Sequence, residues 1–353
     1  MNRRAFIRAS LISSTALAIP AFAQSRATKN VGHVMTVNGF LDASEMGMTL
    51  THEHLFADLR SFEEQRRQTL ELDVDEIIEV VLPHLERARS LGCRTLIDCT
   101  ATHLGRSPAL LRRLSAASGL NVLTVTGSYL AANGHFVPDY AKAETVDQLA
   151  RRWIGEWQGG IEDTGVRPGL IKLGMNGGPL TSLEEKVFRA AVETHRETGL
   201  TIGTHIGPWG EPEPGFCGAS ASQMLAVLEK AQVSPSAWIW FHAQNEKDPS
   251  HHVRAAKIGA WVSFDGLSPE TLAEHIELVK RLRTHELLNR VLVSHDAGWY
   301  TAGEPRGGNF RTFDTVFTEF IPALRTAGFK EDEITQLFVR NPAEAFAIRK
   351  RTT

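Results

Sequence analysis

The sequence has little of what marks nucleic-acid-binding, disulfide-stabilised or repetitive proteins. Lys and Arg together number 38 against 41 Asp and Glu, so there is no basic excess that would attract nucleic acid. The three cysteines, Cys93, Cys99 and Cys217, are too few and too irregularly spaced for a disulfide framework. There is no linker, internal repeat or low-complexity segment. What remains is an ordinary globular composition over 353 residues, long enough for a large core.

The N-terminal apolar stretch, residues 9–19, is too short for a typical membrane span. It follows Arg3 and Arg4 and precedes Ala21-Phe22-Ala23, which has the small-x-small form of a cleavage site. This pattern predicts a twin-arginine signal peptide over residues 1–23 and a mature chain with no stable membrane insertion. It also predicts a periplasmic or secreted location. An uncleaved N-terminal membrane anchor is the alternative.

Short apolar, partly β-branched segments alternate with helical patterns along the mature chain. Such segments are typical of parallel strands that are covered on both faces. We expect strands over residues 48–52, 94–100, 121–128, 170–173, 201–205, 238–242, 261–264 and 291–295. We expect helices over residues 74–91, 107–117, 146–158, 182–198, 220–231, 249–257, 269–283 and 312–327. Ahead of them, Asn38-Gly39 predicts the tight turn of a small hairpin.

A Gly-rich phosphate-binding loop after the first strand is missing as well. Its absence counts against an open doubly wound sheet, which is the alternative architecture. The alternation therefore predicts an α/β fold, a (β/α)8 TIM barrel, with a terminal helix over residues 331–348 packing across it. Residues 24–353 would form this single domain.

The first expected strand ends in His52 and His54, with one residue between them. Residues i and i+2 of a strand point to the same face, so both imidazoles can reach one cation. Imidazole is a good ligand for zinc and similar divalent metals. A single His-x-His pair is nevertheless a weak signal, because two hydrogen-bonded histidines at a strand end are common. The interpretation depends on whether other strands supply further ligands.

Other expected strands do carry such groups at or near their ends. They are Lys172, His205, His242 and Asp296. In a barrel, the catalytic groups come from the ends of several strands, so all six side chains would meet at one mouth. His295 should point away from it, because it precedes Asp296 on the strand.

Lys172 needs a chemical argument of its own. An ammonium group has no lone pair and cannot bind a metal ion. Next to divalent cations the amine would be pushed toward its neutral form. A neutral amine can add carbon dioxide and become a carbamate, whose two oxygens can bridge two metal ions. The six groups together predict a metal-dependent enzyme.

These residues carry a resemblance that extends over nearly all of the mature chain. The sequence resembles the phosphotriesterase family of the amidohydrolase superfamily, including its lactonases. The matching segments are GMTLTHEH at 47–54, RTLID at 94–98, IEDTG at 161–165, IK at 171–172, TH at 204–205, VSHD at 293–296 and NPA at 341–343. Each segment alone is unspecific, but their combination is specific.

The resemblance implies a distorted eight-stranded barrel with two metal ions. His52, His54 and Asp296 would hold the more buried ion, and His205 and His242 the more exposed one. Carboxylated Lys172 and a hydroxide would bridge them. Zinc is the expected metal, with cobalt, manganese or iron as substitutes. Asp296 would accept the proton of the attacking hydroxide, and a homodimer is usual in this family.

The substrate is harder to predict. Tyr129 stands where lactonases of the family also carry a tyrosine, so it is a candidate for orienting the substrate carbonyl. Trp209 could line an apolar pocket or pack at the barrel rim. The stretch 243–248, AQNEKD, departs from the phosphotriesterases, which have a relay aspartate shortly after the histidine corresponding to His242. Gly266 stands where they have a relay histidine and many lactonases an arginine.

These departures weaken the case for an organophosphate hydrolase and for acyl-homoserine lactones as substrates. We therefore expect a lactonase or carboxylic esterase with weak phosphotriesterase activity, acting on a small ester or lactone. An aryldialkylphosphatase is the alternative enzyme. A barrel that has lost catalysis and serves as an exported binding protein is the alternative from another class, although none of the six metal-site groups is missing.

Overall fold

The structure is a computed structural model that describes residues 32–207 and 212–353. The predicted signal peptide and Trp209 lie outside these residues. None of the helices in the described ranges is both long and apolar enough to cross a membrane. The predicted hairpin is confirmed, since β1 (His33–Thr36) pairs antiparallel with β2 (Gly39–Asp42). Gly39 allows the turn between them because its φ of 115° is a conformation that other residues rarely adopt.

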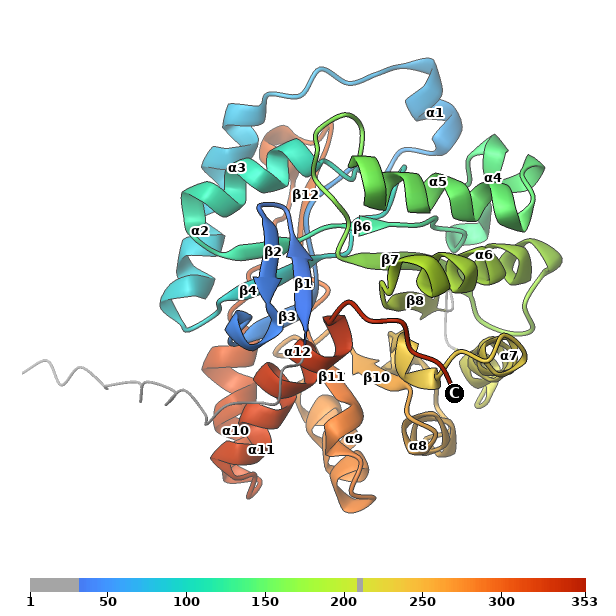
Figure 1. The fold of residues 1–353 in the computed structure, drawn as a ribbon. Coiled ribbons are helices and arrows are strands. Elements are labelled where there is room, and N and C mark those ends of the chain that lie inside the picture. The colour runs from blue at the N-terminus through green and yellow to red at the C-terminus, as the bar shows by residue number, and fades with distance from the viewer. Residues whose placement is uncertain (1–31, 208–211) are drawn as a thin grey trace, which may run out of the picture. The chain divides into compact units, whose positions relative to one another are not determined.

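Parallel strands form the centre of the fold (Figure 1). One sheet has the order β12 (Gly298–Thr301), β3 (Thr49–Ala57), β4 (Thr95–Asp98) and β5 (Asn121–Leu123). The other runs from β6 (Val125–Thr126) through β7 (Leu170–Asn176), β8 (Ile202–Gly207), β9 (Trp238–Phe241) and β10 (Trp261–Phe264) to β11 (Val291–Val293).

The two sheets adjoin along both of their borders. At one border only Thr124 separates β5 from β6. The expected strand 121–128 is therefore one extended segment that is interrupted at Thr124. At the other, Asp296 N–H donates to the carbonyl of His52 (3.0 Å) and His54 N–H donates to the carbonyl of Ala297 (2.9 Å). The segment after β11 is thereby bonded to β3. This arrangement is the distorted (β/α)8 barrel that the sequence predicted.

Two strands differ from the expectation. β3 does not end at His52 but continues to Ala57, so both histidines lie on one uninterrupted strand. β12 was not expected, because this short segment begins with Gly298 and has no apolar run. It forms by pairing with the prolonged end of β3.

Helices surround the strands (Figure 1). They are α1 (Phe62–Arg67), α2 (Val74–Ser90), α3 (Pro108–Ser118), α4 (Asp139–Ala143), α5 (Val146–Gly159), α6 (Ser182–Thr198), α7 (Phe216–Lys230), α8 (Ser250–Lys257) and α9 (Leu272–Thr284). The expected capping pattern of α6 is present, since Thr181 and Glu184 each bond the other's main-chain N–H. α7 begins at Phe216, four residues earlier than the sequence predicted.

The last helices are less regular than expected. The predicted helix 312–327 is a π-helical turn (Val316–Phe320) followed by α10 (Ile321–Thr326). The predicted helix 331–348 is divided into α11 (Glu331–Thr335), a second π-helical turn (Gln336–Arg340) and α12 (Asn341–Phe346). Pro322 and Pro342 are the second residues after the two π-helical turns, and a proline cannot donate the α-helical hydrogen bond.

α12 and the hairpin close one end of the barrel. Phe346 and Val34 belong to one buried cluster with Leu123, Ile239 and Leu292 from the strands. The main-chain N–H of Val37 donates to Val122 at the beginning of β5. The starts of the strands are therefore covered, and the carboxyl ends of the strands form the opposite, functional end.

Candidate metal centre

His52 and His54 are buried side by side on β3. Their ring centroids are 5.3 Å apart, as the alternation along a strand requires. The Nδ1 of His52 lies 2.9 Å from Oδ2 of Asp265, and the Nδ1 of His54 lies 2.9 Å from Oγ1 of Thr100. Each ring is thus oriented through Nδ1, which leaves its Nε2 for another ligand.

Asp296 lies opposite these two histidines. Its Oδ1 is 3.1 Å from Nε2 of His54 and 3.9 Å from Nε2 of His52. The Nε2 of His52 and the Oδ1 of Asp296 are nevertheless buried without a hydrogen-bond partner among the residues described. Buried polar atoms normally have partners, so these two face a place where a further group belongs.

His205 and His242 form the second pair. The ring of His242 is 4.3 Å from the ring of His205 and 4.8 Å from that of His52, centroid to centroid, so it contacts the first pair as well as its own partner. Burial lowers the pKa of His242 to about 4, and it lowers the pKa values of His52, His54 and His205 well below their usual value. All four rings are therefore neutral at pH 7, which is the form that binds metal ions.

Lys172 is buried on β7 between two aromatic rings. Its Nζ lies 5.7 Å from the ring centre of Tyr129 and 5.3 Å from that of Phe241. No carboxylate lies within ion-pair distance of it among the residues described, and burial lowers its pKa. A buried, unpaired ammonium is costly, so this environment favours the neutral amine that carbamate formation requires.

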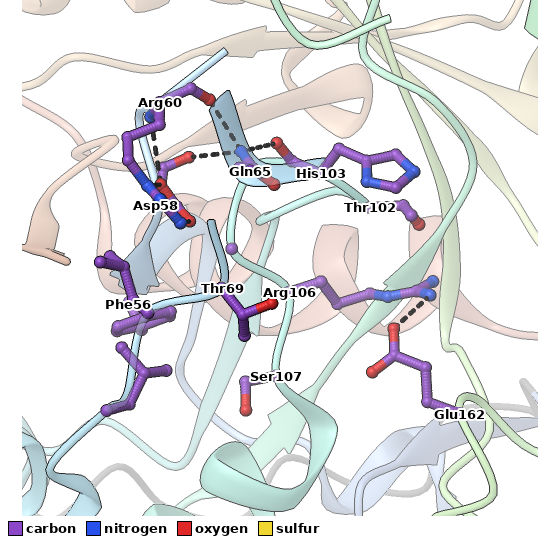
Figure 2. Close-up of a pocket in the computed structure, with 13 residues that line it drawn as sticks. Phe56, Asp58, Arg60, Gln65, Thr69, Thr102, His103, Arg106, Ser107 and Glu162 are labelled. Atoms are coloured by element: carbon purple, nitrogen blue, oxygen red, sulfur yellow. Dashed lines mark hydrogen bonds and ion pairs between the residues drawn. The ribbon is translucent and has the colours of Figure 1, made fainter. Parts of the chain in front are cut away.

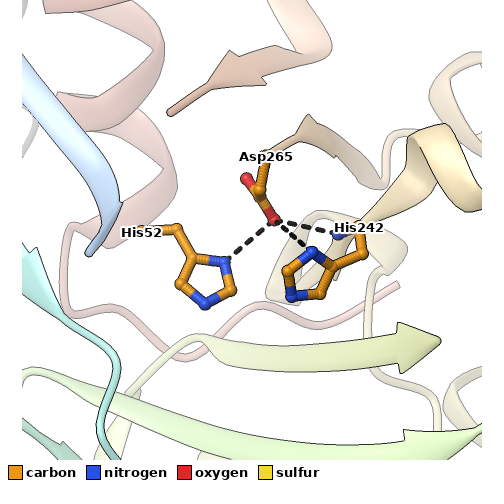
Figure 3. Close-up of side chains that lie close together, drawn as sticks. All are labelled: His52, His242 and Asp265. Carbon is orange, nitrogen blue, oxygen red and sulfur yellow. Dashed lines mark hydrogen bonds and ion pairs between the residues drawn. The ribbon is translucent and has the colours of Figure 1, made fainter. Parts of the chain in front are cut away.

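The structure adds Asp265, which the sequence analysis did not include among the site residues. Figure 3 shows its carboxylate between His52 and His242. Its Oδ2 accepts the main-chain N–H of His242 (2.9 Å) and lies 3.8 Å from Nδ1 of the same residue. Asp265 follows β10 directly, so the signal was the same as for Asp296: an acidic residue at a strand end.

Two groups of side chains could geometrically hold an ion: His52 with His54 and Asp296, and His52 with His242 and Asp265. The first group is the better metal site. Asp265 already accepts hydrogen bonds from both of its neighbours, whereas the first group contains the unpartnered atoms of His52 and Asp296. Asp265 then orients His52 in the way that outer carboxylates orient metal-binding histidines.

Glu53, the residue between the two histidines, holds the segment that carries Asp296. It is fully buried, and its Oε1 accepts the hydroxyl of Ser294 (2.7 Å) and lies 2.7 Å from Nδ1 of His295. Its Oε2 accepts the N–H of Ala297 (2.9 Å). His295 points away from the four-histidine cluster, as predicted from its place before Asp296, and its Nε2 accepts the N–H of Val316.

Tyr129 lies against the second pair of histidines. Its hydroxyl oxygen is 3.2 Å from Nε2 of His205, and its side chain is buried. The structure thus brings together His52, His54, Tyr129, Lys172, His205, His242 and Asp296, all seven candidate site residues. The donor set of neutral imidazoles and carboxylate, with two unpartnered atoms facing each other, fits divalent metal ions such as zinc.

A cavity of about 330 Å³ lies beside this centre, beyond the ends of β3 and β4 (Figure 2). Asp58 and Arg60 form an ion pair on one side of it, and Arg106 pairs with Glu162 on the other. None of the candidate metal ligands lines the cavity. It is therefore a separate hollow and not the metal centre.

A parallel barrel with histidines, a lysine and an aspartate converging at its carboxyl end is the architecture of metal-dependent hydrolases. The sequence profile of the phosphotriesterase family matches residues 32–346, which is most of the chain. The chain therefore belongs to the phosphotriesterase family, whose members are hydrolases with two metal ions.

Individual proteins agree with this assignment. The chain is 29% identical to the phosphotriesterase homology protein of Escherichia coli over 304 residues, covering 85% of this chain and 98% of that protein. A variant of the organophosphorus hydrolase from Deinococcus radiodurans is 27% identical with a TM-score of 0.77, covering 89% and 97% of the two chains. A lactonase from Listeria monocytogenes, 24% identical with a TM-score of 0.75 and covering 90% and 100%, shows the shared fold.

Proposed function

We propose that this protein is an exported hydrolase with two divalent metal ions that cleaves lactones or carboxylic esters and has only weak phosphotriesterase activity. The observation that carries the proposal is the pair of unpartnered atoms, Nε2 of His52 and Oδ1 of Asp296, among neutral imidazoles and next to an unpaired, buried Lys172. Buried polar atoms without partners are unfavourable, and metal ions bound among these groups would supply the partners.

We propose zinc as the native metal, with Lys172 carboxylated to give anionic oxygens in addition to those of Asp296. When bound, two such ions polarise the oxygen of an ester and lower the pKa of water. The carbamate would neutralise part of the metal charge. It would also remove the cost of burying a lysine without a counter-ion.

The chain's own residues supply the proton transfers and the orientation of the substrate. Asp296 would accept the proton of the attacking water and return it to the leaving alkoxide, because its carboxylate lies at the centre of the site, 3.1 Å from Nε2 of His54. In the metal-free protein, burial raises the pKa of this carboxyl to about 6. Burial also raises the pKa of Tyr129, which keeps its hydroxyl protonated and able to donate a hydrogen bond to the substrate carbonyl.

The departures from the phosphotriesterase pattern support the preference for esters. Gly266 has no side chain that could relay a proton, and the neighbouring Asp265 is engaged by His52 and His242. After His242, the buried acid is Glu246, whose carboxylate accepts the N–H groups of Gly215 and Gly218. Neither position offers a free relay group of the kind that organophosphate hydrolases use.

An aryldialkylphosphatase is the second candidate, because the organophosphorus hydrolase of Deinococcus radiodurans is among the similar structures. The test is a panel of lactones, carboxylic esters and one aryl phosphotriester on the zinc- or cobalt-loaded chain 24–353. We expect a higher kcat/KM for a lactone or ester than for the phosphotriester. The reverse order would favour the second candidate, and fewer than two metal ions per active chain would contradict the two-metal proposal.

Lys172→Ala is the sharpest variant for this proposal. We expect it to lose metal and activity, with partial rescue by added short carboxylic acids that replace the carbamate. Lys186→Ala is the matched control, since that lysine caps main-chain carbonyls at the surface. Unchanged turnover of Lys172→Ala would contradict the carbamate.

Export, membrane release and assembly remain proposals. We propose twin-arginine export with cleavage after Ala23, which the mass of the protein isolated from the periplasm would test. A homodimer is proposed from the family resemblance alone. Light scattering of the metal-loaded chain would test it.

A further inference from the structure

Arg311 lies beside the metal centre and follows Asp296 by 15 residues in the sequence. Its main chain is bonded to Gly298 in both directions, with N–H to carbonyl distances of 2.9 and 3.1 Å. Gly298 is two residues after Asp296 and begins β12. The backbone of Arg311 is therefore fixed beside the end of the strand that carries the candidate catalytic aspartate.

The guanidinium group reaches back over this end. Nη2 of Arg311 donates to the main-chain carbonyl of Asp296, which also accepts Nε1–H of Trp299 (2.9 Å). The ring of Trp299 in turn stacks on His54, with centroids 3.8 Å apart. The side chain of Asp296 is 25% exposed, and Arg311 is exposed, so solvent reaches the centre on the side of these residues.

Arg311 has no acidic partner, unlike two arginines that follow the carboxyl ends of β3 and β12. Arg60 pairs with Asp58, and Arg306 pairs with Glu79. Among the residues described, no carboxylate lies within ion-pair distance of Arg311, and only one of its five N–H groups has an acceptor. A fixed, unpaired cation at the entrance attracts anions, and a guanidinium binds a carboxylate with two parallel hydrogen bonds.

We propose that Arg311 binds a carboxylate of the substrate at the entrance of the metal centre. The substrate is then an ester or lactone that carries a carboxylate outside the bond to be cleaved. This inference rests on the proposed function. Gly266 stands where many lactonases carry an arginine. Arg311 would supply a cation to the site from a different part of the barrel.

The test uses two esters that differ only in one distal group, a free carboxylate or its neutral methylamide. We expect the wild-type, metal-loaded protein to have a lower KM for the carboxylate. In Arg311→Gln, the ratio of the two kcat/KM values should fall at least about tenfold, through KM, as expected for a lost charge-assisted hydrogen bond. Arg306→Gln is the matched control, because that arginine lies on the same segment but pairs with Glu79.

Binding provides a readout that does not depend on turnover. Calorimetry with the ether analogue of the anionic ester should show tighter binding than with the neutral ether in wild type, a difference that is lost in Arg311→Gln and that weakens with added salt.

An unchanged ratio in Arg311→Gln would overturn the inference. If both kcat/KM values fell equally, Arg311 would act only by holding the carbonyl of Asp296, and if neither value changed, Arg311 would have no role in hydrolysis. Ester hydrolysis itself would stand in both cases. If wild type cleaved neither ester, the proposed function would fail, and the calorimetric comparison would still decide whether Arg311 binds carboxylate.

Discussion

Replacing Asp265 by asparagine should loosen the metal centre although Asp265 is not itself a candidate ligand. The carboxylate accepts the Nδ1–H of His52 at 2.9 Å and the main-chain N–H of His242 at 2.9 Å, and the side chain is fully buried. An amide keeps the shape but removes the charge. Both donors point at Oδ2, so the amide oxygen can still accept them, and the NH2 group then replaces Oδ1, which accepts the hydroxyl of Ser263. Hydrogen bonds to charged acceptors contribute roughly 1.5–3 kcal/mol each, about twice the contribution of hydrogen bonds to neutral ones.

The expected result is a metal affinity lower by roughly 10–100-fold, which corresponds to about 1.4–2.8 kcal/mol. Competition of the loaded protein with a chelator measures it, with the metal content followed by mass spectrometry. Asp314→Asn is the control, since this acid pairs with Arg87 at the surface. If Asp265→Asn retained both ions as tightly as wild type, the orientation of His52 by Asp265 would be irrelevant to metal binding. Complete loss of one ion would instead indicate that Asp265 is itself a ligand, and our choice between the two groups would then be wrong.

Three further predictions concern proton transfer, stability and packing. Asp296→Asn should lower kcat far more than it raises KM, in steady-state kinetics of the metal-loaded protein. His195 bonds Leu200 and Arg351 through its two ring nitrogens, and burial lowers its pKa from 6.5 to about 4; its contribution to stability is thus complete above pH 6.5 and is lost as the pH falls to 4. The loss is about 3 kcal/mol at most, and urea unfolding of His195→Gln should show a flatter dependence on pH in this window. Gly127→Ala should disturb Lys172, because a Cβ at position 127 would lie 2.2 Å from its carbonyl oxygen, and thermal melting together with metal content would show it.

The strands and their terminal residues could be predicted because each produces a local signal. His52 and His54 alternate along one apolar strand, and Lys172 interrupts another apolar run. Asp265 was missed since its meaning depends on His52, which is 213 positions away in the sequence. Arg311 was missed for the same reason: it lies in a segment without periodicity and reaches the centre only through the pairing of its backbone with Gly298. Such contacts are properties of the closed barrel and not of any window of sequence.

Two buried acids that are not candidate ligands, Asp265 and Glu53, explain how the strand ends tolerate unfavourable backbone conformations. His242 and Asp296 both have a positive φ, 58° and 51°, which non-glycine residues rarely adopt. Asp265 holds the first through its N–H, and Glu53 holds both neighbours of the second through the N–H groups of His295 and Ala297. In each case a carboxylate compensates for backbone strain and at the same time orients a histidine. The His-Glu-His segment therefore contributes three functional side chains and not two, because its glutamate fixes the position from which Asp296 faces His54.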